Sequence, residues 1–374
     1  MVNAHQGGPP ALVFVELTKR CDLACVHCRA SAGLEILQDE LTVDQVRGFL
    51  EELVMRSRRK LHVIYTGGNI ALVRDLDEFM SMTRNLGLSF SLSPSPSEYT
   101  DLGFLERARN HGAASISTSI DGLQDIHDRI RGSRGSFSNA VRIIREAKSL
   151  GVPVQVNTLV ALENIMDLPH VFTRIRELGV EVWELFFLIN TGRGRVMNDL
   201  EAEQVEDVLH WLAHIRKYFR SVRTVEAPQF SRILAISCSS VRKGNLFNYL
   251  VASSGIPVLD SDHPGEPVSP RGRTLFLSSE GEVYPSGFLP VSLGSIRNIP
   301  FREELSGYLE NDFRVIGENE NGRCDICFYS TICGGSRARS YAYTGDIMQP
   351  DPSCLLNAQL LPLIRNHGGG DGKR

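Results

Sequence analysis

The stretch Ala11-Leu-Val-Phe-Val-Glu-Leu-Thr-Lys-Arg-Cys-Asp-Leu-Ala-Cys-Val-His-Cys28 joins an apolar, β-branched run to three closely spaced cysteines. Residues 12–17 predict a strand, because valine, leucine and phenylalanine dominate them. Cys21, Cys25 and Cys28 follow at once with C-x3-C-x2-C spacing. A loop that directly follows a strand lies at the strand's carboxyl end, where α/β proteins with parallel strands place their functional sites.

Strand and helix patterns alternate from this stretch to residue 219. Strands are predicted at 12–17, 61–65, 88–92, 114–120, 153–160 and 181–189, and helices at 42–57, 75–86, 101–111, 138–150, 167–178 and 201–219. At the start of the first helix, Thr42 and Gln45 form the pattern of a capping box. Six such units predict an α/β fold, a partial (β/α)6 TIM-like barrel over residues 11–219.

The composition changes after the barrel. Residues 220–272 are rich in proline and show little periodicity, so we predict a linker with irregular loops. Residues 273–285 predict a β-hairpin that turns at Glu280-Gly281. A cysteine-rich segment follows, and we assign 273–360 to a small α+β domain.

The bulk properties exclude several classes of protein. The chain has 374 residues and a formal net charge of −4, which gives no sign of a nucleic-acid partner. No apolar stretch reaches the roughly 20 residues that cross a bilayer, and the first residues lack the pattern of a signal peptide. We therefore expect a cytoplasmic protein with no membrane partner. Eight cysteines in a reducing compartment indicate metal binding or catalysis before disulfides.

The first three cysteines suit a particular kind of iron–sulfur site. Three thiolates hold three corners of a [4Fe-4S] cluster and leave one iron open to a further ligand. A zinc knuckle is the alternative, although zinc sites favour paired cysteines with a fourth ligand. With this spacing after its first strand, the chain resembles the radical S-adenosylmethionine (SAM) superfamily. The resemblance implies that SAM binds the open iron and is cleaved by one electron to a 5′-deoxyadenosyl radical.

The same resemblance implies a set of SAM contacts at the ends of later strands. It assigns Gly67, Gly68 and Asn69 after the second strand, Ser119 and Arg131 after the fourth, Asn157 in the fifth and Leu188 in the sixth. Glycines suit a close approach of backbone, and a guanidinium suits the SAM carboxylate. The family usually has an acidic residue where Asn69 stands, which leaves a carboxylate contact at this point in doubt.

Four further cysteines lie near the C-terminus. Cys324, Cys327, Cys333 and Cys354 give C-x2-C-x5-C, two glycines, and a last cysteine after Asp351-Pro. Residues 323–354 resemble the end of a SPASM or twitch domain, which implies a second, auxiliary [4Fe-4S] cluster with four thiolate ligands. A structural zinc ion in the same four sulfurs is the alternative.

One cysteine, Cys238, is left over. Three roles stay open for it: a buried small side chain, a cluster ligand, or a thiol that donates a hydrogen atom to a substrate radical. The third role leads to our first hypothesis, the epimerisation of a carbon in a sugar or oligosaccharide with Cys238 as the catalytic donor.

Other reactions fit the same cofactors. The first alternative is oxidative decarboxylation of a porphyrin propionate or a uronate, in which Arg193 and Arg195 would hold a carboxylate. Peptide modification is a second alternative, disfavoured because no leader-binding domain precedes the first strand, and an iron–sulfur electron carrier is a third. We expect a small-molecule substrate and a flavodoxin- or ferredoxin-type reductant.

Overall fold

The computed structural model describes residues 11–35, 40–57, 59–235, 244–257, 274–297, 303–310, 324 and 327–357. Its strands are β1 (Ala11–Glu16), β2 (Leu61–Thr66), β3 (Ser89–Leu92), β4 (Ile116–Ser119), β5 (Val154–Val160), β6 (Val182–Phe187), β7 (Ser221–Val225), β8 (Thr274–Leu277), β9 (Glu282–Tyr284) and β10 (Gly294–Ser295).

The α-helices are α1 (Val43–Arg56), α2 (Leu76–Asn85), α3 (Leu102–Asn110), α4 (Gln124–Arg131), α5 (Ser136–Ser149), α6 (Leu168–Glu177), α7 (Ala202–Ile215), α8 (Gln229–Ala235), α9 (Asn245–Ser253), α10 (Glu303–Glu310) and α11 (Arg337–Thr344). Short 3-10 turns are η1 (Ile70–Leu72), η2 (Ile165–Asp167), η3 (Gly192–Val196) and η4 (Arg216–Tyr218).

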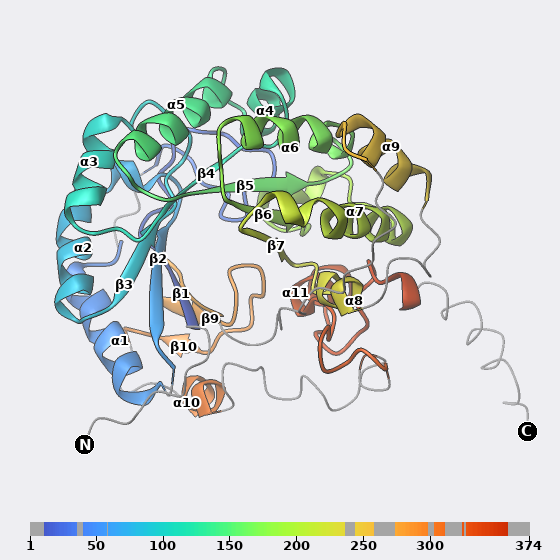
Figure 1. Cartoon of the computed structure of the whole chain (residues 1–374). Coiled ribbons are helices and arrows are strands. Elements are labelled where there is room, and N and C mark those ends of the chain that lie inside the picture. Colours follow the sequence, from blue (N-terminus) through green and yellow to red (C-terminus); the bar gives the residue numbers. More distant parts are fainter. Residues whose placement is uncertain are drawn as a thin grey trace, which may run out of the picture.

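One sheet organises the molecule. Its strand order is β10-β9-β8-β1-β2-β3-β4-β5-β6-β7, and the strands from β8 to β7 in this order run parallel. The helices from α1 to α7 form an arc on the outside of the curved sheet, and the C-terminal segments lie across its open side (Figure 1). The predicted α/β fold, a partial barrel with a C-terminal appendage, is confirmed.

The two faces of the sheet differ because side chains alternate along each strand. Residues such as Val63, Tyr65 and Trp183 are fully buried and belong to the large apolar core of the protein. The alternate residues face inward, and many are polar, as Ser117 and Gln155 show on neighbouring strands. The inside of the barrel is therefore a polar surface rather than a second apolar core.

Residues 220–272 differ from the prediction. Their described part contains β7, α8 and α9, so the expected linker and irregular loops are wrong for these stretches. β7 pairs in parallel with β6 and extends the sheet, and α9 packs Phe247 and Leu250 into the core beside α7. Elements of five to nine residues are too short for a period to stand out in the sequence.

The predicted hairpin of 273–285 is confirmed, with its turn at Glu280-Gly281. β8 also pairs in parallel with β1, from Leu12 opposite Thr274 to Val15 opposite Leu277. The hairpin thus continues the barrel sheet and covers the edge of β1, which would otherwise expose unpaired backbone groups. A boundary between domains at residue 273 remains a prediction.

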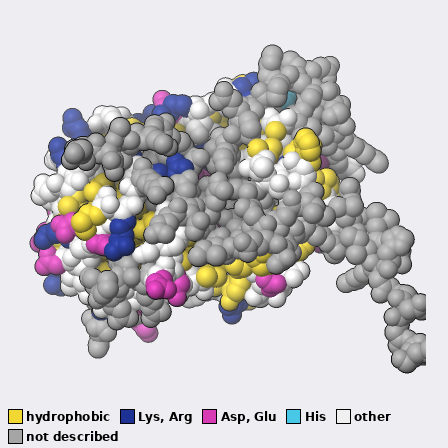
Figure 2. Space-filling view, turned by 90° about the horizontal axis from the view of Figure 1, so that it is seen from below, with side chains coloured by type: hydrophobic (Ala, Val, Ile, Leu, Met, Phe, Trp, Pro, Cys, Tyr) yellow, Lys and Arg dark blue, Asp and Glu magenta, His cyan; other side chains and the backbone are white. Residues whose placement is uncertain are grey.

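Among the coloured residues of the face seen in Figure 2, basic and acidic side chains are interspersed. In the described part of the chain, no helix combines the length and the apolar character needed to cross a bilayer.

Helix α1 provides a test of the core. The predicted capping box at Thr42 and Gln45 is present, and Leu53 is fully buried, whereas Met55 on the same helix is 73% exposed. We expect Leu53→Ala to lower the free energy of unfolding by about 2–5 kcal/mol, because it leaves a cavity, and Met55→Ala to change it by less than about 0.5 kcal/mol. Anaerobic urea denaturation measures both, and equal losses would contradict the assigned packing.

Candidate active site

The cysteine loop lies at the carboxyl end of β1 and brings its three thiols together. The thiols of Cys21, Cys25 and Cys28 are free and near enough to interact electrostatically. Backbone amides point at two of the sulfur atoms: Leu23 donates to Cys21 Sγ at 3.4 Å, and Ala32 donates to Cys28 Sγ at 3.3 Å. Burial raises the pKa of the Cys25 thiol to about 11. The arrangement suits thiolates stabilised by a bound cationic group and by N–H donors.

Gly67 and Gly68 hold this loop against β2. The Gly68 amide donates to the Thr18 carbonyl at 2.7 Å, and the Asn69 amide donates to the Arg20 carbonyl at 2.8 Å. A Cβ on Gly67 would lie 2.5 Å from the Thr18 oxygen, and one on Gly68 would lie 2.3 Å from the Arg20 oxygen. The close approach that requires glycine is thus an approach to the cysteine loop, and a contact of Gly67 or Gly68 with SAM remains a prediction.

Asn69 is fully buried, and protein groups occupy its side-chain amide. Its Nδ2 donates to Asp22 at 2.7 Å and to Ser97 at 2.9 Å, and its Oδ1 accepts from the Ala71 amide at 3.1 Å. The residue therefore ties the cysteine loop to the segments after β2 and β3. The structure gives Asn69 a positioning role, and its predicted contact with SAM stays untested.

Arg193 also clamps the loop. Its Nε donates to the Cys25 carbonyl at 2.8 Å and its Nη1 to the Ala32 carbonyl at 2.5 Å, while its amide donates to the Cys28 carbonyl at 3.0 Å. The loop carbonyls occupy Nε and Nη1 of the guanidinium, so the structure gives Arg193 a positioning role, and its contact with a substrate carboxylate remains a prediction. Arg195 on the same 3-10 turn is exposed.

Helix α4, which the sequence patterns did not reveal, supports the loop from another side. The Ala24 and Val26 amides donate to the last carbonyls of α4, those of Arg131 and Ile130, at 3.2 and 2.9 Å. The Arg131 guanidinium donates to the buried Asp121 at 2.6 Å and lies 4.0 Å from Cys25 Sγ. Burial alone would raise the pKa of Asp121, but the Arg131 guanidinium lowers it well below its usual range.

The other predicted SAM contacts lie on or near the inner face. Ser119 and Asn157 are register partners on β4 and β5 and are both partly exposed. Asn157 Oδ1 accepts from Gln155 at 2.7 Å. Leu188 is 2% exposed and packs in a small cluster with Ile130 of α4. Ser119, Arg131, Asn157 and Leu188 thus surround the carboxyl ends of the strands, where the cysteine loop lies.

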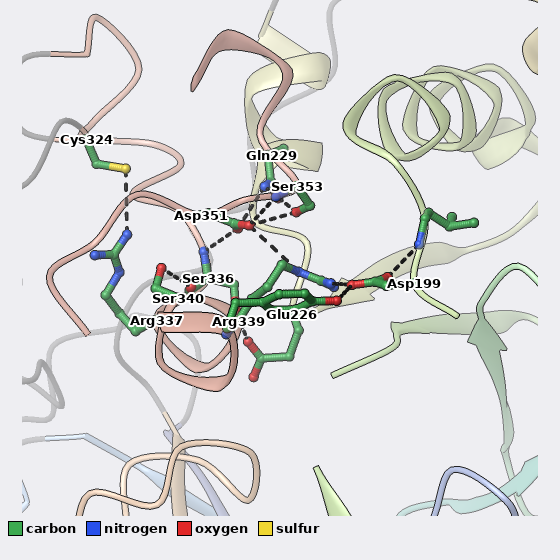
Figure 3. A network of polar contacts seen from close by, with 12 residues as sticks. Asp199, Glu226, Gln229, Cys324, Ser336, Arg337, Arg339, Ser340, Asp351 and Ser353 are labelled. Carbon is green, nitrogen blue, oxygen red and sulfur yellow. Dashed lines mark hydrogen bonds and ion pairs between the residues drawn. The ribbon is translucent and has the colours of Figure 1, made fainter. Parts of the chain in front are cut away.

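The four C-terminal cysteines form a second group of free thiols. Cys324 interacts electrostatically with Cys327, and Cys333 with Cys354. Burial raises the pKa of Cys333 to about 12. Asp351, fully buried, accepts hydrogen bonds from the Ser336 amide and the Gln229 side chain, both at 2.8 Å, and so fixes the segment before the last cysteine (Figure 3).

A buried network connects this second group to the barrel. Glu226, in a left-handed conformation (φ 58°) directly after β7, accepts a 2.5 Å hydrogen bond from Ser336 and a 3.3 Å bond from Ser286. Arg339 of α11 is fully buried and pairs with Asp199, which lies between η3 and α7 (Figure 3). The sequence patterns gave no role to Glu226, Asp199 or Arg339, because contacts between residues so distant along the chain leave no local signal.

The comparisons with known proteins agree with this geometry. A model of the radical SAM superfamily matches residues 15–175. The AdoMet-dependent heme synthase of Methanosarcina barkeri is 32% identical over 354 residues, which are 92% of this chain and 96% of that protein. The chain belongs to the radical SAM superfamily.

Two more relatives extend the comparison. The Fe-coproporphyrin III synthase of the same organism is 24% identical over 370 residues, with 94% of this chain and 88% of that protein covered. The crystal structure of Streptococcus suis SuiB bound to precursor peptide SuiA has a TM-score of 0.66 at 13% identity and covers 92% of this chain and 76% of that one. At this identity the likeness with SuiB concerns the fold.

Radical SAM enzymes bind a [4Fe-4S] cluster and SAM, and the cysteine loop fits the cluster. It offers three free thiols, N–H donors at two of the sulfur atoms, and the Arg131 guanidinium beside the third. Among the described residues, no three Cys, His, Asp or Glu side chains converge as the ligands of one metal ion do.

The C-terminal site contains a buried charge that fits an anionic cluster. Arg337 is 8% exposed and donates to Cys324 Sγ at 3.6 Å, while its Nε–H is buried with no partner in the described part of the chain. A Cβ on Gly335 would lie 2.8 Å from Arg337 Nη2 and 3.3 Å from Cys324 Sγ, so glycine is needed where the backbone passes both groups. A cluster with four thiolates carries net negative charge and matches this guanidinium.

Substitution of Gly68 tests the support of the loop. We expect Gly68→Ala to remove the N-terminal cluster and halve the iron content, because its Cβ would lie 2.3 Å from the Arg20 oxygen. Gly33→Ala is the matched control, since a Cβ there meets no atom within 4 Å. Iron and sulfide analysis after anaerobic reconstitution measures the effect, and full iron content in Gly68→Ala would refute it.

Substitution of Arg193 tests the clamp. Arg193→Gln removes charge-assisted hydrogen bonds to two loop carbonyls, and such bonds contribute about 1.5–3 kcal/mol each. We expect iron to leave the N-terminal site about tenfold faster or more under a chelator, whereas the exposed Arg195→Gln leaves this rate unchanged. Equal rates for the two variants would argue against the clamp.

Proposed function

We propose that this radical SAM enzyme oxidatively decarboxylates a propionate side chain of a porphyrin-class substrate. The observation that carries the proposal is the 32% identity, over 92% of this chain and 96% of the relative, to a protein named AdoMet-dependent heme synthase. The similarity to an Fe-coproporphyrin III synthase points to the same class of substrate.

In this proposal each part of the chain has a defined task. Cys21, Cys25 and Cys28 hold the first cluster, and the inner faces of β4 and β5 hold SAM, with Ser119 and Asn157 as contacts. When bound, cluster and SAM together supply a 5′-deoxyadenosyl radical, which removes a hydrogen atom from the substrate. Cys324, Cys327, Cys333 and Cys354 hold an auxiliary cluster, and a flavodoxin- or ferredoxin-type protein is the proposed reductant.

Apolar side chains near the cysteine loop support a substrate with a large apolar surface. Leu34, shortly after the loop, is 74% exposed, and Val196, on the turn that clamps the loop, is 85% exposed. Val26 within the loop is 36% exposed. We propose that these three side chains contact the apolar surface of the tetrapyrrole.

The earlier leading hypothesis, epimerisation of a sugar, finds no support in the comparisons. Its hydrogen donor, Cys238, lies outside the described residues. Peptide modification is supported by the fold likeness to SuiB and by 25% identity over 370 residues to a PqqA peptide cyclase of Rhodopseudomonas palustris, whereas the AdoMet-dependent heme synthase reaches 32% identity over 354 residues.

An anaerobic assay in deuterated water distinguishes the three reactions. We expect an iron porphyrin with propionate side chains, with SAM and a strong reductant, to give a product lighter by carbon dioxide and two hydrogen atoms and free of deuterium. Mass spectrometry measures the product, and Cys25→Ala is the inactive control. The proposal would be overturned if the porphyrin stayed unchanged and the enzyme acted on another substrate. That product would be an isomeric sugar that carries one deuterium, or a peptide lighter by two hydrogen atoms.

A further inference from the structure

Three buried arginines lie close to the C-terminal cysteines or their supports, and they differ in their partners. Arg232 of α8 interacts with Cys333 and Cys354 and pairs with Glu206 at 2.5 Å. Arg339 pairs with Asp199 and lies 3.7 Å from Asp351. Each of these two charges is therefore matched by a carboxylate.

Arg337 is different. Its Nη1 donates to the Ile347 carbonyl at 2.7 Å, and its Nη2 donates to the Gly334 carbonyl at 2.8 Å and to Cys324 Sγ at 3.6 Å. No carboxylate of the described residues is within ion-pair distance of this guanidinium, and the one at Asp346, which interacts with it electrostatically, is exposed to solvent. Figure 3 shows Arg337 directed at Cys324, while Arg339 points the opposite way toward Asp199.

A buried cation without an anion is costly, unless an anionic group lies beside it. Hydrogen bonds to the Ile347 and Gly334 carbonyls hold the guanidinium in place, with Nη2 directed at Cys324 Sγ. The position of the positive charge is therefore fixed by backbone groups. The same charge opposes the effect of burial on the Cys324 thiol, whose pKa burial raises. Arg337 is thus a fixed positive charge at a ligand of the proposed auxiliary cluster.

We propose that Arg337 raises the reduction potential of the auxiliary cluster, so that this cluster accepts the electron released by the substrate. Net charge and hydrogen bonds to sulfur set the potentials of such clusters. The reduced cluster carries one more negative charge than the oxidised one, and a nearby guanidinium therefore stabilises the reduced form more. Arg337 is a positioning and tuning residue in this proposal, since it touches a ligand and not the substrate.

The inference rests on the proposed function for the source of the electron. After loss of one hydrogen atom, a propionate side chain is R–CH•–CH2–COO⁻. Cleavage of its carbon–carboxylate bond gives R–CH=CH2, carbon dioxide and one electron. The auxiliary cluster is the one-electron acceptor that balances this step, and a higher potential makes the transfer more favourable.

Redox titration followed by electron paramagnetic resonance tests the role of Arg337 without turnover. In Arg337→Gln we expect the ratio of reduced to oxidised auxiliary cluster at a fixed potential to fall about tenfold, a shift of about 59 mV toward more negative values for a one-electron couple. Arg337→Lys keeps the charge and is expected to stay near the wild-type midpoint. Arg337→Met is a second neutral variant in case the glutamine protein does not retain its cluster.

Two controls accompany the titration. The N-terminal cluster of the same protein should keep its midpoint in every variant. The variant Arg47→Gln removes one exposed positive charge from the outer helix α1 and should leave the auxiliary midpoint almost unchanged. An auxiliary midpoint in a cluster-loaded neutral variant that equals the wild-type value would overturn the role of Arg337.

Product analysis separates this inference from the proposed function. A shifted midpoint in a protein that never decarboxylates a porphyrin would leave Arg337 as a tuning residue and refute the proposed reaction. Decarboxylation by the wild-type protein, with no shift in the variants, would keep the reaction and refute the role of Arg337.

Discussion

Two backbone hydrogen bonds hold the cysteine loop on the sheet, from the Gly68 amide to Thr18 and from the Asn69 amide to Arg20. They require the backbones to approach so closely that a Cβ on Gly68 would overlap a carbonyl oxygen. Arg193 binds the loop from η3, which follows β6, and the end of α4 binds it from a third side. The three thiols lie together because these segments, distant in sequence, converge at the carboxyl ends of parallel strands.

The polar inner face of the barrel complements this loop. A barrel filled with apolar side chains would leave no place for a polar cofactor, but here β4 and β5 present Ser119 and Asn157 on the inner face. The second group of cysteines is tied to the same face. Glu226 follows the last barrel strand and accepts a hydrogen bond from Ser336 at the start of α11. Its strained backbone conformation places the carboxylate at this junction.

Much of the fold and of the site could be predicted from local patterns. The six strand–helix units, the capping box at Thr42 and the hairpin turn at Gly281 each leave a signal within a few residues. The parallel pairing of β8 with β1 could not be predicted, because its partners are far apart and the strand is short. For the same reason, the sequence suggested Arg193 as a carboxylate ligand, whereas the fold uses its guanidinium to hold loop carbonyls.

The central claim is that the cysteine loop holds a cluster with one iron open to SAM. Electron paramagnetic resonance of the reduced protein tests it most directly, in a variant whose four C-terminal cysteines are replaced by alanine so that one cluster contributes. The account predicts that added SAM changes the shape of the signal and that Cys25→Ala removes the signal. A loaded cluster whose signal is the same with and without SAM would contradict it.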